Sequence, residues 1–183
     1  ETITKPVFLQ LPVIQGEVRL PSDANLLKVA VIRRGWKDGR FPVGFVEGLG
    51  FKLGAVASSF SVSLNHVVVV GSSDSDMALA VSRLEKLGGG VVVVNGGRVV
   101  EELPLPLGGL MSPESSGWLA RKLKAIKRLL WKAGAPFENP LNPIQFLTFT
   151  YLPWIRITDK GLVDVKNRRI ISLLLGEGEG AAA

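Results

Sequence analysis

The only histidine of the chain, His66, is the one imidazole that could act as a general base. Asn65 precedes it, and the nearby hydroxyl groups belong to Ser58, Ser59, Ser61 and Ser63. Nucleophilic catalysis pairs such a base with a serine, but the G-x-S-x-G turn that presents the nucleophile in many hydrolases is absent. A hydrolytic metal site needs several converging His, Asp, Glu or Cys ligands, and the chain has one histidine and no cysteine. The residues therefore predict no catalytic residue and no metal ligand in this chain, and they favour a structural role for His66.

The elements around His66 read as strand, helix and strand. Residues 67–70 and 91–94 are short valine runs. Between them, residues 74–87 place apolar side chains at helical spacing, with Ser73 as N-cap and Gly88 as the left-handed exit. Asn95-Gly96-Gly97 then predicts a hairpin into a strand at residues 98–102. Since the two valine strands flank one helix, we expect them to run parallel. The fold predicted is α+β, layered, with a mixed sheet, a βαβ unit, a hairpin and two main helices.

The second main helix concentrates positive charge on one short segment. Ser112 followed by Pro113 predicts its start, and the helical pattern runs to about residue 133. Six cations lie on it without an acidic residue among them: Arg121, Lys122, Lys124, Lys127, Arg128 and Lys132. The net charge of +6 invites a nucleic-acid partner, but no RNA-binding aromatic motif or zinc knuckle is present. A solvated helix face is favoured over a phosphate-binding one. Residues 146–152 are predicted to form a further strand.

Length and composition indicate one domain. The 183 residues fit a single domain at residues 1–175, followed by a flexible tail at 176–183. No apolar run is long enough to span a membrane, and the N-terminus has no secretory pattern, so we expect a soluble, cytoplasmic protein. The many valines and charges, with little Gln or Met, are compatible with a thermophilic source.

Several segments are specific enough to indicate a family. In order, they are LLKVAVIRR, VGFVEGLGFKLGAVASSF, DMALAV, LGGGVVVV, ELPLPLGGLMS and TDKGLVDV. Over residues 26–165 the chain resembles the C-terminal domain of adenine deaminases of the amidohydrolase type. The resemblance implies a fuller enzyme that hydrolyses adenine to hypoxanthine and ammonia. It also implies a catalytic barrel before this region that holds a divalent metal, namely manganese, iron or zinc.

One motif of that family is not matched. Its members carry a His-Asp-Ser-His-Asn run before the valine strand, whereas this chain has Val62-Ser63-Leu64-Asn65-His66. No catalytic or metal-binding residue is therefore carried over from the resemblance. The candidates for lining a ligand cleft are Ser59, Ser63, Asn65 and His66.

Three functions follow, in order of preference. The first is the C-terminal domain of an adenine-deaminase-like hydrolase, inactive alone, that packs against the barrel in cis or in trans. The second is a stand-alone, non-enzymatic module that binds a purine-like ligand or a partner protein. The third is a basic nucleic-acid binder. Whether the chain forms a homo-oligomer stays open.

Overall fold

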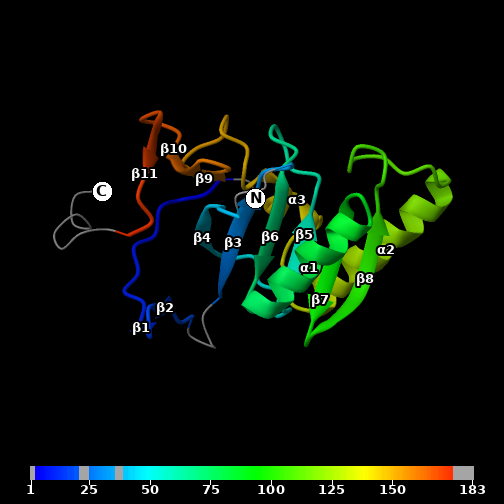
Figure 1. The fold of residues 1–183 in the computed structure, drawn as a ribbon, viewed down its shortest axis with the longest axis horizontal. Coiled ribbons are helices and arrows are strands. Elements are labelled where there is room, and N and C mark those ends of the chain that lie inside the picture. Colours follow the sequence, from blue (N-terminus) through cyan, green and yellow to red (C-terminus); the bar gives the residue numbers. More distant parts are fainter. Residues whose placement is uncertain (1–2, 21–24, 36–38, 175–183) are drawn as a thin grey trace.

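A six-stranded sheet forms the centre of the fold (Figure 1). The computed structural model describes residues 3–20, 25–35 and 39–174. The predicted tail at 176–183 lies outside these residues, as does the centre of Gly35-Trp36-Lys37-Asp38-Gly39, whose composition predicts a turn. Across the sheet the strands follow the order β4 (Val43–Glu47), β3 (Leu26–Ile32), β6 (Val67–Gly71), β5 (Ala55–Ser58), β7 (Gly90–Asn95) and β8 (Arg98–Pro104).

The α+β class is confirmed, and the strand pairing adds one difference. The valine strands β6 and β7 run in the same direction, but β5 lies between them and pairs antiparallel with both. The two valine strands are thus parallel to each other, as predicted, but every neighbouring pair of this sheet in the described residues is antiparallel. The reason lies in β5, whose four small or β-branched residues are all buried. A strand buried on both faces belongs at the centre of a sheet.

Helix α1 (Asp74–Lys86) covers one face of the sheet, as predicted. Its side chains Met77, Ala80 and Leu84 pack against alanines and valines of the strands. Ser73 is the N-cap, and its hydroxyl accepts a hydrogen bond from the Asp76 amide. The alanines on this face leave room for the helix to lie close to the sheet.

Helices α2 (Ser116–Lys132) and α3 (Leu141–Phe146) cover the other face, where Ile126 and Leu130 are fully buried. The predicted start of α2 was wrong, because Ser115 rather than Ser112 is its N-cap and accepts from the Trp118 amide. Ser115 lies closer than Ser112 to the first apolar residue of the helical pattern. Its hydroxyl can therefore accept from a backbone amide of the first helical turn. None of the described helices is long and apolar enough to cross a bilayer.

A small antiparallel sheet completes the described chain. It consists of β9 (Ile155–Thr158), β10 (Gly161–Asp164) and β11 (Arg169–Ile171). The strand predicted at residues 146–152 was wrong: the chain leaves α3 at Phe146 and makes turns up to the start of β9. Leu147 packs in the core from a turn, and the apolar run of this stretch resembles a strand in sequence.

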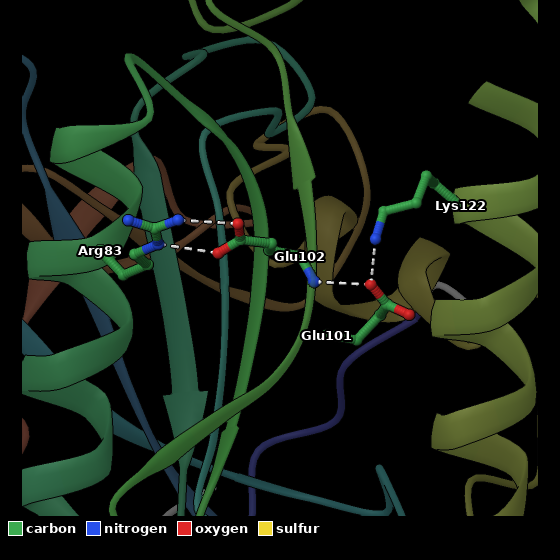
Figure 2. Close-up of polar contacts among 4 residues, drawn as sticks. All are labelled: Arg83, Glu101, Glu102 and Lys122. Atoms are coloured by element: carbon green, nitrogen blue, oxygen red, sulfur yellow. Dashed lines mark hydrogen bonds and ion pairs between the residues drawn. The ribbon is translucent and has the colours of Figure 1, made fainter. Parts of the chain in front are cut away.

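Two consecutive glutamates on β8 join the strand to the helices on both faces of the sheet (Figure 2). Arg83 of α1 donates two hydrogen bonds, at 2.7 and 2.8 Å, to the carboxylate of Glu102. Lys122 of α2 donates to the carboxylate of Glu101. Neighbouring residues of a strand point to opposite faces, so β8 holds α1 and α2 through adjacent positions.

The first described residues form an extended segment outside these layers, here called the N-terminal arm (residues 5–20). It contains the short strands β1 (Val13–Ile14) and β2 (Glu17–Val18), which pair with each other. Just before the arm, Thr4 makes a parallel bridge with Trp154. The arm therefore starts from a point fixed beside β9.

Replacing Leu84 with alanine is expected to lower the free energy of unfolding by about 2 to 4 kcal/mol, because it leaves a cavity in a packed core. Leu84 is 1% exposed and lies in the cluster between α1 and the sheet. Urea denaturation measures the loss. Leu123→Ala on the exposed side of α2 is the matched control, and a loss there as large as that of Leu84→Ala would contradict the assignment of the core.

Candidate functional site

The residues that could do chemistry meet at one end of the central sheet. Ile32 pairs with Val67, and Ser58 pairs with both Val68 and Val91. This register brings the ends of β3 and β5 beside the starts of β6 and β7. This register also places the residues just beyond these strand ends at the same edge of the sheet. They are Arg33, Arg34, Ser59, His66 and Gly89.

His66 is the central titratable group of this edge. Its Nε2 lies 3.8 Å from the Oδ2 of Asp159, and both side chains are mostly buried. Its Nδ1 is buried and has no hydrogen-bond partner among the described residues. Burial lowers the pKa of His66 below its ordinary value, and Arg33 and Arg34 act in the same direction, whereas Asp159 opposes them. The imidazole is therefore neutral at pH 7, with one nitrogen able to donate and one able to accept a hydrogen bond.

The loop before His66 is held in an uncommon backbone conformation. Ser63 and Asn65 have φ angles of 75° and 49°, in the left-handed region. Ser61 donates a hydrogen bond to the His66 carbonyl, and Thr148 donates to the Val62 carbonyl, which ties the loop down from both ends. Positive φ at residues other than glycine persists where the surroundings impose it, and such positions cluster at functional sites.

Ser59 is more buried than the loop residues, and its hydroxyl already makes hydrogen bonds within the fold. The hydroxyl donates to the Gly109 carbonyl at 2.6 Å and accepts from the Gly90 amide at 2.7 Å. The Ser59 carbonyl accepts from the Arg34 guanidinium at 2.6 Å. A ligand contact by this hydroxyl would have to replace one of these bonds.

The four predicted ligand-binding residues therefore fall into two groups. The structure brings Ser63, Asn65 and His66 together in one surface loop, while Ser59 lies buried beneath the edge. Their role in ligand binding stays a prediction. Sequence reasoning missed Asp159, whose contact with His66 spans two distant turns. Its position in the turn Thr158-Asp159-Lys160-Gly161 was the available signal.

The edge does not fit a metal ion. Within the part of the chain that the structure describes, no three His, Cys, Asp or Glu side chains come close enough together to hold one. His66 and Asp159 are two potential ligands without a third. The chemistry that this arrangement supports is hydrogen bonding by a neutral imidazole next to a carboxylate.

Acidification is expected to weaken the fold through His66. Because its pKa is lower in the folded chain than the ordinary 6.5, the unfolded chain binds the proton first, and the free energy of unfolding falls as the pH drops through this value. Above about pH 7.5 both states are neutral and the contribution vanishes. His66→Gln should remove this part of the pH dependence, by less than about 1 kcal/mol between pH 7.5 and 5.5.

Urea denaturation of both proteins over this pH range measures the difference. If the wild-type chain instead gained stability relative to His66→Gln on acidification, the attraction of Asp159 would outweigh burial, and the direction of the pKa shift would be wrong.

Comparisons with known proteins extend the resemblance. A family model described as the adenine deaminase C-terminal domain matches residues 1–169. The adenine deaminase of Moorella thermoacetica is 38% identical over 173 residues, which are 94% of this chain and 29% of that protein. The adenine deaminase of Kosmotoga olearia is 36% identical over 177 residues, 97% of this chain and 31% of the relative. That of Brucella anthropi is 38% identical over 163 residues, 89% of this chain and 29% of the relative.

The chain thus spans about 30% of the length of the curated relatives it matches. The match with the family model extends beyond residues 26–165, on which the resemblance was first based, and includes the whole N-terminal arm. The motifs, the extent of this match and the identity to three relatives agree: the chain belongs to the adenine deaminase C-terminal domain family.

Proposed function

We propose that this chain serves as the C-terminal domain of an adenine-deaminase-like hydrolase, which converts adenine and water to hypoxanthine and ammonia. One observation carries the proposal. The chain aligns over 94% of its own length with the Moorella adenine deaminase but covers only 29% of that protein. A domain that accounts for less than a third of an enzyme leaves most of the catalytic machinery to the remaining part.

The proposal assigns the metal chemistry to that remaining part. The resemblance implies a catalytic barrel with manganese, iron or zinc, which would activate water for attack on the ring. The residues at the sheet edge do not fit such an ion, since the described part of the chain offers no cluster of three ligands. We therefore propose that this chain is inactive alone and packs against the barrel, as one cytoplasmic domain over residues 1–175.

The contribution of the sheet edge within this assembly would be hydrogen bonding. His66 is neutral at pH 7 and its neighbour Asn65 carries an amide, so the loop presents both donors and acceptors. Adenine also carries donors and acceptors on its ring edges. The proposal therefore places Ser63, Asn65 and His66 at the surface that faces the barrel.

A chimera tests the proposed function. The region of Moorella adenine deaminase that this chain matches is replaced by this chain, and release of ammonia from adenine is measured. We expect the chimera to turn over adenine and this chain alone to release none. The Moorella protein truncated before the matched region is the control for what the catalytic part does alone.

Two results would contradict the proposal. One is turnover of adenine by this chain alone, accompanied in elemental analysis by about one tightly bound transition metal per chain. The other is a folded, metal-loaded chimera without activity, which would favour the stand-alone binding module instead.

A further inference from the structure

The N-terminal arm exposes apolar side chains that a folded domain normally buries. The exposed fractions are 56% for Val7, 47% for Phe8, 54% for Leu9, 63% for Val13 and 54% for Ile14. Scattered single apolar residues are normal on protein surfaces, but a contiguous apolar segment marks an interaction site. Five such side chains within eight residues of sequence meet that description.

The backbone of the arm makes few hydrogen bonds among the described residues. Among backbone hydrogen bonds between described residues, those of residues 5–20 stay inside the arm. They consist of the β1–β2 pairing and a bond from the Arg19 amide to the Pro12 carbonyl. An isolated pair of two-residue strands is only marginally stable in water without further packing. Within the part of the chain that the structure describes, these backbone bonds therefore do not tie residues 5–20 to the layers of the fold.

The fold nevertheless anchors the start of the arm. Before the arm, the Thr4 carbonyl accepts from the amides of Trp154 and Ile155, at 3.0 and 3.3 Å. After the arm, the next described strand is β3, which pairs with β4 and β6 in the six-stranded sheet. Figure 1 shows the segment passing along the outside of the molecule between these points, at the end of the long axis opposite to α2. The arm is thus anchored beside β9 through Thr4, and its apolar side chains are exposed.

We propose that the N-terminal arm is the docking surface through which this domain binds an apolar patch on the catalytic region of the longer enzyme, an inference that rests on the proposed function. More than two thirds of each relative's length lies outside the part that this chain matches, which supplies a large partner. Because the matched family is a C-terminal domain, that length in the relatives would precede the segment that corresponds to the arm. Covalent connection gives the partner a high effective concentration, so modest apolar contacts suffice.

The basic helix α2 is the weaker candidate for this contact. Its exposed cations are well solvated in water, so nothing drives them into an interface in the absence of an acidic partner. Exposed valine, phenylalanine and leucine side chains, by contrast, gain free energy from any apolar cover. The apolar contact is therefore placed at the arm and not at α2, in addition to the polar contact proposed for Ser63, Asn65 and His66.

Hydrogen–deuterium exchange of the full chain and of the Moorella chimera tests the inference. In the chain alone, amides of residues 5–18 should exchange rapidly. In the chimera, the same amides should exchange at least about tenfold more slowly, since docking covers them. The amides of Val68, Val69 and Val70 in β6 are the internal reference, because their protection shows that the domain is folded in both samples.

Matched variants test whether the apolar side chains of the arm cause the slower exchange. Phe8→Asp combined with Leu9→Asp should restore rapid exchange of the arm in the chimera. Met111→Asp, at an apolar side chain that is 63% exposed outside the arm, should not. Arm amides that are already protected in the free chain, or that exchange equally fast in both folded samples, would overturn the inference.

Activity of the same chimera separates the two proposals. An active chimera with an unprotected arm would overturn the docking surface and leave the proposed function standing. An inactive chimera with a protected arm would overturn the proposed function and support the docking surface.

Discussion

Gly90→Ala is expected to unfold the domain, with a loss of about 4 kcal/mol or more in the free energy of unfolding. A Cβ atom at this position would lie 1.8 Å from the Leu103 carbonyl oxygen. The obstacle is the backbone of the paired strand β8, which cannot rotate away as a side chain can. The φ angle of Gly90 is also +129°, a conformation that residues with a Cβ rarely adopt. Circular dichroism during urea denaturation measures the loss.

Gly117→Ala is the matched control for this experiment. In the first turn of α2, a Cβ at Gly117 would meet only the Arg121 guanidinium, at 3.7 Å. Because alanine has a higher helix propensity than glycine, we expect a gain of about 0.5 to 1 kcal/mol. Stability of Gly90→Ala within about 1 kcal/mol of the wild type would show that β7 and β8 can separate at low cost.

Arg156→Met is expected to cost about 3 to 5 kcal/mol, because it leaves buried carbonyl groups without their donor. Arg156 is 2% exposed. Its guanidinium donates to the carbonyls of Leu152, Phe146 and Pro153 at 3.0, 3.1 and 2.9 Å. These carbonyls belong to the turns between α3 and β9, so the side chain holds an irregular segment in place. Differential scanning calorimetry would record the lower melting temperature.

Two further substitutions show whether the hydrogen bonds are the cause. Arg156→Lys should recover little of the loss, since one ammonium group cannot reproduce the planar fork of a guanidinium. Arg169→Met removes an arginine whose side chain is 68% exposed and should change stability by less than about 1 kcal/mol. An Arg156→Met protein as stable as Arg169→Met would mean that water satisfies the three carbonyls.

The sequence predicted those helices and turns that depend on residues close together in the chain. Apolar spacing and a serine cap were sufficient for α1, and Asn95-Gly96-Gly97 was sufficient for the β7–β8 hairpin. The insertion of β5 between β6 and β7 could not be predicted in this way, because it depends on pairing between distant segments. In α2 the sequence predicted Ser112 as the cap, whereas the helix begins after Ser115, whose hydroxyl accepts from the Trp118 amide.

The candidate site was likewise predictable only where its residues are close together in the sequence. Ser63, Asn65 and His66 are neighbours in sequence, so their common loop was predictable. The contact of His66 with Asp159 joins residues more than ninety positions apart and depends on how the small β9–β11 sheet lies against the loop. The arm is a third case, because only the structure shows that β1 and β2 pair with each other and with no other described strand.

The place of β5 in the sheet has a consequence for synthesis of the protein. Ribosomes produce β5 before either of its neighbours, and β7 is complete only at Asn95. A nascent chain that ends between Gly71 and Gly90 can pair β5 with β6 but leaves the other edge of β5 open. Open apolar edges template association with other chains. Fragments that stop in this interval should therefore aggregate, whereas chains that extend through the second valine strand carry β5 with both edges paired.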